Sequence, residues 1–429
     1  MMEKETKFKK TEIGMIPEDW RIEELRNTVT KLGDGLHGTP KYDTGGDYFF
    51  INGNNLVNSR IKMTDNTKKC SKEEFDKYKK ELTDRTILVS INGTLGNVAF
   101  YNNEKVILGK SACYFNLKNN IDKNYVKYIL LGNLFQNYIQ LNATGTVIKN
   151  MPLKRMREFK FPLPTLSEQK AIAKILSDLD SKIETLQKQN EVLENMGQLL
   201  FKRWFADFEF PDEDGKGYRS NGGEMVESEL GEIPTGWRVG KLGEIGKIIC
   251  GKTPSTKNKD YFEGTIPFIK IPDMHNNIFI LKTGETLSEE GKNSQTNKTI
   301  PQDSICVSCI ATVGVVSMTT KDSQTNQQIN SIIPSSDFIK YYLYYYLKSI
   351  KNKLKDIGSG GAVTLNVNTS VFSNISILVP SEKILKRFND NMKASFTKIK
   401  NNMIQIQSLT KLRDTLLPKL MSGKVRVSL

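Results

Sequence analysis

Histidine is almost missing from this sequence and cysteine is sparse, with two histidines and five cysteines among 429 residues. His37 and His275 are too few to build a histidine-rich metal or acid–base site. The cysteines are odd in number and scattered along the chain, unlike the dense, even set of a secreted disulfide scaffold, so reduced thiols are expected. These shortages argue against many hydrolases and against a disulfide-stabilised secreted protein.

A long hydrophobic run is also missing. The longest mostly apolar stretch, Ser304 to Met318, is too short and too polar to span a bilayer. The segment Met1 to Lys10 is charged and does not resemble a signal peptide. We therefore expect a cytoplasmic protein without membrane segments.

Acidic residues are in deficit, because 48 Asp and Glu face 62 Lys and Arg, giving a formal net charge of +14. A hydrophobic content of 38% is enough to build folded cores. A folded protein with this excess charge favours a polyanionic partner, and DNA or RNA is a commoner one than a membrane surface.

What the sequence does contain is an internal duplication, as expected for a chain longer than one compact core. Matching segments recur in the same order at a nearly constant spacing: Thr11–Arg21 with Ser228–Arg238, Ile87–Phe100 with Ile305–Met318, and Phe161–Pro164 with Ile377–Pro380. In the part of each repeat that comes before the long helix, short apolar runs alternate with Gly, Asn and Asp. This pattern indicates mixed strand and loop. The polar, glycine-rich stretch Pro211–Gly223 fits a linker.

Each half ends in the pattern of a long helix. The Thr165 hydroxyl can cap the first helix, with Glu168 completing a capping box, and Ser381 is the matching cap of the second. Heptad spacing then predicts a coiled-coil seam through Ile172, Leu176, Leu179, Ile183, Leu186, Asn190, Leu193, Gly197 and Leu200. Alignment places Phe388, Met392, Ser395, Ile399, Asn402, Ile406, Leu409, Arg413 and Leu416 on the second seam.

Each seam thus carries one asparagine, Asn190 or Asn402. A polar seam residue often fixes the register of two helices at some cost in stability. Because the two positions are not equivalent in the alignment, a solvated flaw is an equally open interpretation.

These patterns predict an α+β protein with two pseudo-symmetric globular domains, each followed by a long helix, and with the two helices packed as an antiparallel coiled coil. The expected division is a first domain at 1–164, a helix at 165–206, a linker at 207–227, a second domain at 228–380, and a second helix with the C-terminal tail at 381–429.

The whole chain resembles the specificity subunit of type I restriction-modification enzymes. The resemblance is carried by IPEDWR at Ile16–Arg21, IPTGWR at Ile233–Arg238, PLPTLSEQKAIAKIL at Pro162–Leu176, LLFKRWF at Leu199–Phe205 and LLPKLMSG at Leu416–Gly423. The second copy departs from it, because Pro380–Phe388 reads PSEKILKRF and lacks SEQ. Leu199–Phe205 can be either core or docking surface, and core is favoured.

The resemblance implies a non-catalytic subunit whose two target-recognition domains each read half of a split DNA sequence. Methylation subunits, expected to number two, would dock on it, carry S-adenosylmethionine and methylate adenine. A motor-nuclease subunit that uses ATP would join for cleavage, so no cofactor or metal is expected on this chain. Pseudo-two-fold symmetry further predicts that Gly423 lies near Thr11.

Base edges and phosphates are contacted by Lys, Asn, Thr and similar side chains, often from loops. Suitable loops occur at matching places in the two halves: Gly35–Tyr42, Asn52–Asn55, Thr144–Asn150, Gly251–Tyr261 and Ser359–Asn366. The candidate DNA contacts in them are Lys41, Tyr42, Asn52, Asn54, Thr144, Lys149, Lys252, Lys257, Lys259 and Asn366. For any single one of these side chains an ordinary solvated loop position is the favoured interpretation, so the loops are a stronger prediction than the individual residues.

Three further motifs, GKIICGKT, PDEDGK and the pair Cys306 and Cys309, have to be weighed against this function. Gly246–Thr253 (GKIICGKT) matches the phosphate-binding pattern GxxxxGK[ST], and with PDEDGK in the linker it supports the alternative of a nucleotide-dependent nuclease or ATPase. The pair Cys306 and Cys309 lacks further ligands for zinc and would face opposite sides of a strand, so packing is its expected role. A coiled-coil adaptor without a DNA role is the third alternative.

Overall fold

The computed structural model describes residues 6–359 and 365–427, which form two compact units. The first unit combines Met1–Ile183 with Ser408–Leu429, and the second is Glu184–Gln407. The chain therefore passes from one unit to the other within each of its two long helices. The expected α+β class and the expected pairing of the long helices are confirmed.

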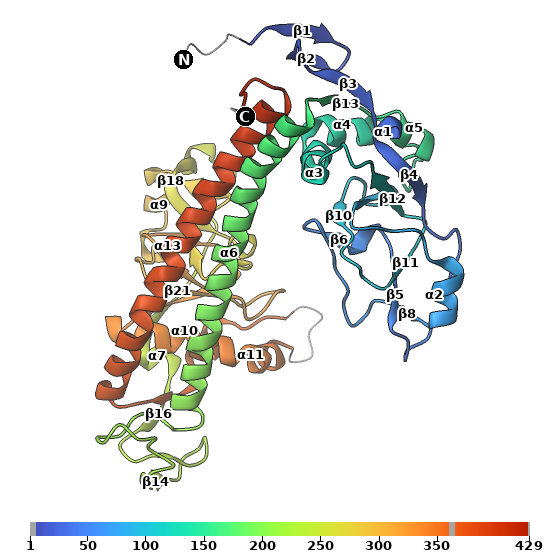
Figure 1. Cartoon of the computed structure of the whole chain (residues 1–429). Coiled ribbons are helices and arrows are strands. Elements are labelled where there is room, and N and C mark those ends of the chain that lie inside the picture. The colour runs from blue at the N-terminus through green and yellow to red at the C-terminus, as the bar shows by residue number, and fades with distance from the viewer. Residues whose placement is uncertain (1–5, 360–364, 428–429) are drawn as a thin grey trace. The chain divides into compact units, whose positions relative to one another are not determined.

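The first unit contains two main sheets, ordered β10-β9-β12-β4 and β11-β5-β8, and a two-stranded β13-β3 sheet (Figure 1). Its strands are β1 (Phe8–Thr11), β2 (Gly14–Pro17), β3 (Arg21–Glu24), β4 (Val29–Asp34), β5 (Tyr48–Ile51), β6 (Leu56–Val57), β7 (Arg60–Ile61), β8 (Lys69–Cys70), β9 (Thr86–Ser90), β10 (Val98–Phe100), β11 (Val106–Leu108), β12 (Ala112–Leu117) and β13 (Lys160–Leu163). Its shorter helices are α1 (Leu25–Thr28), α2 (Lys72–Tyr78), α3 (Lys123–Leu131), α4 (Asn133–Asn142) and α5 (Leu153–Arg157), with a 3₁₀ turn η1 (Gly53–Asn55).

The second unit repeats this plan in its main sheets, with one additional strand at the edge of the larger sheet. Its sheets are ordered β22-β21-β24-β17, extended by β19, then β23-β18-β20 and β16-β25. Its strands are β14 (Met225–Val226), β15 (Ile233–Pro234), β16 (Arg238–Lys241), β17 (Gly246–Cys250), β18 (Phe262–Ile269), β19 (Phe279–Ile280), β20 (Glu285–Leu287), β21 (Ile305–Ser308), β22 (Val316–Thr319), β23 (Gln324–Thr325), β24 (Ile329–Pro334) and β25 (Ser376–Val379). Its shorter helices are α7 (Leu242–Ile245), α8 (Ile271–Met274), α9 (Glu289–Asn293), α10 (Lys340–Ser349), α11 (Lys351–Gly358) and α12 (Thr369–Ser373), with 3₁₀ turns η2 (Lys259–Tyr261), η3 (Thr296–Lys298) and η4 (Asp337–Ile339).

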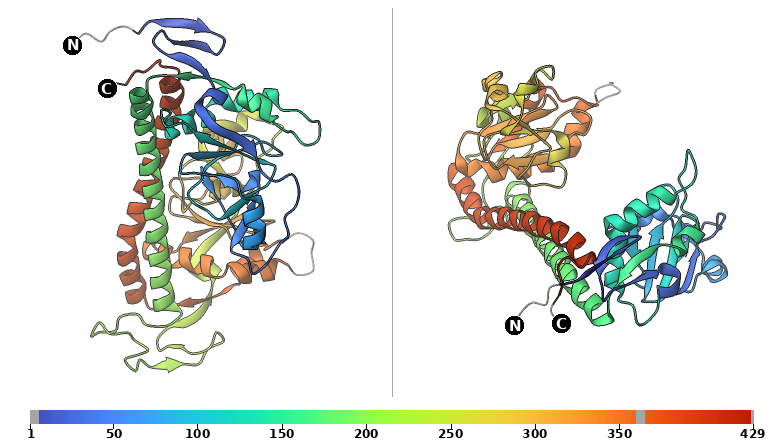
Figure 2. Two further views of the ribbon diagram at one scale, coloured as in Figure 1. Left: turned by 45° about the vertical axis from the view of Figure 1, so that its right-hand side comes forward. Right: turned by 90° about the horizontal axis from the view of Figure 1, so that it is seen from above.

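The long helices α6 (Leu166–Phe205) and α13 (Glu382–Met421) have 40 residues each and lie side by side (Figures 1 and 2). They run antiparallel, because Asp180 bonds Arg413 while Asn190, further along α6, bonds the earlier Asn402. Expected seam residues are buried on both helices, among them Ile172, Leu176, Leu186, Phe388, Met392 and Ile399. Of the helices in the described part of the chain, none is both long enough and apolar enough to cross a membrane.

The two seam asparagines meet each other. The Asn402 amide donates to the Asn190 carboxamide oxygen at 2.9 Å and also reaches Gln189 Oε1 at 3.4 Å, and Asn402 is only 1% exposed. Asn190 and Asn402 are not at equivalent positions of the two repeats, yet they pair. This is possible because two antiparallel helices bring together positions that do not correspond in the repeat alignment.

Each long helix ends in the core of the other half's domain. Leu420 and Met421, at the end of α13, are buried with Trp20 in the first unit. Phe201 and Phe205, at the end of α6, are buried among aromatic rings of the second, with the Phe205 ring 4.7 Å from that of Tyr342. Leu199–Phe205 is core only in part, because Phe201, Trp204 and Phe205 are buried whereas Leu199, Lys202 and Arg203 are exposed.

The start of α6 is only partly as expected. The Thr165 hydroxyl accepts the Glu168 amide at 3.4 Å, but the Glu168 carboxylate does not turn back to close a capping box. It accepts from Trp20 Nε1 at 3.0 Å and from Arg426, which also binds Asp19 at 2.7 Å. Gly423 packs so closely that an added Cβ would lie 2.3 Å from Pro17 Cγ. The C-terminal tail thus contacts Pro17 at the end of strand β2, in the hairpin that contains Thr11 but at the end opposite its turn.

Replacing Asn190 with leucine should lower the thermal stability of the protein, because the buried Asn402 amide would keep only its long contact with Gln189. The expected cost is about 1–3 kcal/mol, measured by calorimetry. The double change N190L/N402L should recover most of it, since both partners become apolar. N401L, at an exposed neighbouring position of α13, is the control. Unchanged melting of N190L would contradict a role for the pair.

Candidate nucleic-acid interface

Five loops of the first unit gather at one end of its strands, and we call them the first loop edge: Gly35–Tyr42, Asn52–Asn55, Ile91–Gly96, Gly109–Ser111 and Thr144–Asn150. Backbone hydrogen bonds tie them together, from Leu36 N to Leu108 O at 2.7 Å, from Ile91 N to Ser111 O at 2.9 Å and from Gly93 N to Lys149 O at 3.0 Å. Three of the loops are those that the sequence selected. The other two, at residues 91–96 and 109–111, were missed.

The second unit builds a matching second loop edge from Gly251–Asn258, Lys270–His275, Cys309–Gly314, Asn326–Gln328 and Leu365–Asn366. Corresponding bonds recur, from Lys252 N to Thr325 O at 2.9 Å, from Cys309 N to Gln328 O at 2.8 Å and from Ala311 N to Leu365 O at 3.0 Å. Even the left-handed backbone of Gly93, with φ of 73°, is repeated at Ala311, with φ of 61°. Residues 360–364 of the predicted loop Ser359–Asn366 lie outside the described residues.

The side chains of Lys41, Tyr42, Asn54, Thr144 and Lys149 are exposed. Lys41 and Tyr42, the last residues of their loop, flank the first loop edge, because the Lys41 amide bonds Glu74 of α2 at 2.8 Å and Tyr42 bridges Cys70, opposite the first residue of β5. Tyr42 is 48% exposed, and Lys68 Nζ lies 5.9 Å from the centre of its ring. Asn52 is different, because its carboxamide oxygen accepts the Ser111 hydroxyl at 2.8 Å and thereby holds two loops of the edge together.

In the second edge, Lys252 and Asn366 are exposed beside the shared hydrogen bonds. Lys257 and Lys259 are also exposed. However, Lys259 begins the turn η2, which packs against α9. The contact is close: the carbonyl oxygen of Tyr261 in η2 would lie only 2.1 Å from a Cβ atom added to Gly291 of α9. Lys259 therefore flanks the edge, while Lys252 lies within it.

The phosphate-loop interpretation of GKIICGKT is wrong. Gly246–Cys250 forms strand β17, paired antiparallel with β24, and is extended backbone in a sheet. The Lys252 amide is bonded to Thr325 O, and its carbonyl accepts from Gln295 Nε2 at 2.7 Å. Since a phosphate loop needs free amides that point at one ligand, this segment cannot act as one.

The other two motifs are structural. The Asp212 carboxylate accepts the Lys216 amide at 2.8 Å in a linker turn, and the described residues contain no cluster of three potential metal ligands. Cys306 lies in strand β21 and Cys309 directly follows it, and the two are buried in different hydrophobic clusters, so both have the expected packing role. Burial raises the pKa of Cys306 to about 12 and that of Cys309 to about 11, so both are inert thiols.

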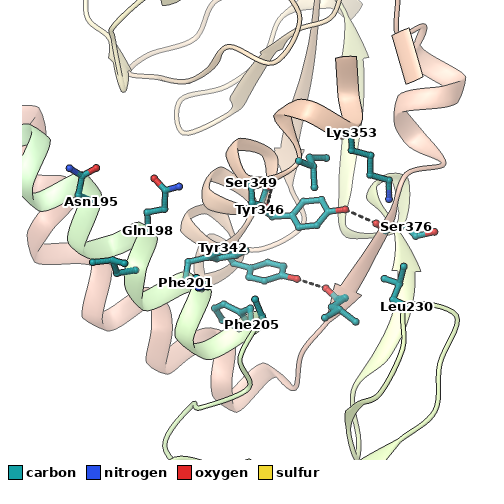
Figure 3. A pocket seen from close by; sticks show the side chains of 15 residues that line it. Asn195, Gln198, Phe201, Phe205, Leu230, Tyr342, Tyr346, Ser349, Lys353 and Ser376 are labelled. Atoms are coloured by element: carbon teal, nitrogen blue, oxygen red, sulfur yellow. Dashed lines mark hydrogen bonds between the residues drawn. The ribbon is translucent and has the colours of Figure 1, made fainter. Parts of the chain in front are cut away.

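An apolar groove of about 720 Å³ opens beside the end of α6 (Figure 3). Phe201 and Phe205 form one wall, Tyr342 and Tyr346 another, and Leu230 lies across from them. The Tyr342 and Tyr346 hydroxyls donate to the carbonyls of Leu378 and Ser376, which fixes both rings. Leu199 lines the groove and is 68% exposed.

The first unit has a groove of about 410 Å³ at the corresponding place, beside the end of α13. Leu417 and Met421 replace Phe201 and Phe205, and Ile13 replaces Leu230. The Tyr125 hydroxyl donates to Pro162 O at 2.7 Å, as Tyr342 does to Leu378 O. The duplication has thus produced the same apolar groove twice, which sequence reasoning missed because its walls come from distant segments.

Comparison with known proteins identifies the family. A model of the type I restriction modification DNA specificity domain matches twice, over residues 17–195 and 234–409. The HindI specificity subunit of Haemophilus influenzae is 40% identical over 314 residues, or 61% of this chain and 68% of that protein. The MjaIX specificity subunit of Methanocaldococcus jannaschii is 29% identical over 448 residues, covering 99% and 97%.

A solved S subunit of a type I restriction-modification system from M. genitalium shares the fold, with a TM-score of 0.60 at 20% identity over 94% of this chain and 96% of that one. The chain therefore belongs to the type I restriction-modification DNA specificity family, with two copies of the family domain. It is a non-catalytic subunit that recognises the DNA target. The resemblance seen in the sequence is confirmed.

Proposed function

We propose that this chain reads a split DNA target, with one half-site at each loop edge, and directs adenine methylation and cleavage by partner subunits. The observation that carries this proposal is the repetition of one hydrogen-bonded loop edge with different exposed side chains. A shared backbone gives both edges the same way of approaching DNA, whereas different side chains allow them to read different bases.

The candidate contacts fit this division of roles. The lysines Lys41, Lys149 and Lys252 suit phosphates, and the polar side chains of Asn54, Thr144 and Asn366 suit base edges. Asn52 supports its edge from within, and Lys257 and Lys259 would contact flanking phosphates. These assignments make residues 1–164 and 228–380 the two target-recognition domains.

The helices are suited to set the distance between half-sites. A helix of 40 residues spans about 60 Å, while one turn of DNA is about 34 Å. Half-sites separated by several base pairs are therefore within reach. In this scheme residues 165–206 and 381–429 are the spacer, and Asn190 with Asn402 fixes its register.

The two grooves would each receive one methylation subunit. Both present exposed apolar side chains, such as Leu199 in one and Met15 in the other, beside fixed aromatic or aliphatic walls. A surface that occurs twice by duplication binds the same partner twice, which gives two methylation subunits per chain. S-adenosylmethionine would be bound by these partners, and ATP by a motor-nuclease subunit.

Adenine methylation sites should be mapped by sequencing in cells that express the chain with and without its methylation partner. We expect a split motif only when both are present, and exchange of one domain should change one half of the motif. The absence of any adenine motif, or a single uninterrupted motif, would contradict the proposal.

The change L199D should remove one methylation subunit from the complex, and M15D should remove the other, because each places a carboxylate in an apolar groove. Native mass spectrometry should show one subunit lost in each single variant and both lost in the double variant. L412D alters an α13 leucine that is 46% exposed and lies outside both grooves, so it is the control. Two subunits retained by the double variant would exclude the grooves as docking sites.

A further inference from the structure

We propose that Lys110 and Gln327 are equivalent base-reading residues, with Lys110 directed at guanine in one half-site and Gln327 at adenine in the other. This inference rests on the proposed function, and it names the position at which the two half-sites are distinguished.

The two residues occupy the same corner of the same turn. Gly109–Ala112 joins β11 to β12 and is closed by a bond from Ala112 N to Gly109 O at 3.0 Å. Asn326–Ile329 joins β23 to β24 and is closed by the corresponding bond, from Ile329 N to Asn326 O, at 3.2 Å. Lys110 and Gln327 follow the first residue of each turn, and both are exposed.

Each turn is held from several sides at the middle of its loop edge. Gly109 N donates to Ile51 O at 2.8 Å, and Asn326 N donates to Ile269 O at 3.1 Å. On the other side, Ser111 O and Gln328 O accept the amides that begin the loops after β9 and β21. A side chain that reads bases must start from such a fixed backbone, because a mobile one loses the geometric discrimination.

The turn in the first unit has an additional brace. The Ser111 hydroxyl donates to Asn52 Oδ1, and Gly53 N donates to Ser111 Oγ at 2.8 Å. A Cβ at Gly109 would lie 2.2 Å from Asn52 Oδ1, so only glycine allows this close approach. The Lys110 side chain beside this brace is exposed, and among the described residues no acidic side chain forms an ion pair with it.

Gln327 is oriented in a different way. The Thr253 hydroxyl donates to Gln327 Oε1 at 2.7 Å, which fixes the amide plane while the oxygen keeps a second lone pair. A glutamine amide presented in this way can accept from adenine N6 and donate to N7. An ammonium group such as that of Lys110 instead donates to the two acceptors of guanine, O6 and N7.

The difference between the duplicates fits base reading. Phosphates are the same in both half-sites whereas the bases differ, and this turn keeps its backbone while the hydrogen-bonding group at its tip changes from an ammonium to an amide. The backbone of the turn is the same in both copies and only the hydrogen-bonding pattern of the tip differs, as expected of a position that reads a different base in each domain.

The test is methylation-site sequencing with K110Q and Q327K in the full chain, co-expressed with its methylation partner. K110Q should change or relax one base of one half-site, with about ten- to a hundredfold loss of discrimination for guanine there, and leave the other half and the gap unchanged. Q327K should do the same for an adenine of the other half-site. K118Q, which removes the same charge beyond the far end of β12, should leave the motif intact.

An unchanged motif in K110Q and Q327K, or a uniform loss of methylation at all sites of the normal motif, would overturn the inference. Both results are informative only while the unaltered chain yields a split motif. If it yields none, the proposed function itself has failed, and the two failures are therefore distinguishable.

Discussion

The structure depends on the antiparallel pairing of α6 with α13. Each helix starts from one target-recognition domain and ends inside the core of the other, where Phe201 and Phe205 or Leu420 and Met421 are buried. Neither domain is complete without the far end of the helix that follows its counterpart. Burial of large apolar side chains stabilises a fold by about 1.5–3 kcal/mol each, so this exchange couples the helix pair to both domains.

The polar groups in this pairing give it a defined alignment. A purely apolar seam can slide by a turn at little cost, whereas Asn190 and Asn402 satisfy each other only when they are opposite. The Arg413 guanidinium bonded to Asp180 adds a second, charged match at 3.0 Å. At the end of the chain, Arg426 joins Asp19 and Glu168, and this hydrogen bonding lowers the pKa of Asp19. The helix pair is therefore held at several points along its length.

The sequence was sufficient for the features that repeat or have a period. Duplication, both long helices, the seam and the loops holding Lys41, Asn54 and Lys149 could all be predicted, because heptads and repeated phrases are local signals. The absence of the capping box at Thr165 could not be predicted from the sequence. The Glu168 carboxylate instead accepts hydrogen bonds from Trp20 and Arg426, which are distant in sequence and come near it only in the folded protein.

The features that were missed depend on long-range contacts. Lys110 and Gln327 look like ordinary residues before a buried strand, and only the alignment of β12 with β24 could have drawn attention to their equivalence. The grooves were invisible because their walls come from the opening hairpin, a mid-domain helix and the end of a long helix. GKIICGKT supported only the alternative function, and the structure excludes it, since its letters match a phosphate loop while Gly246–Cys250 is a sheet strand.

The central claim is that the helix pair spaces two independent readers of DNA. Its most direct test inserts one heptad into α6 and one into α13 at facing positions of the seam, and then maps adenine methylation. Seven residues add about 10 Å, or about three base pairs at ~3.4 Å each. The account predicts the same two half-sequences with a gap longer by about that amount. Methylation at the original spacing would contradict it.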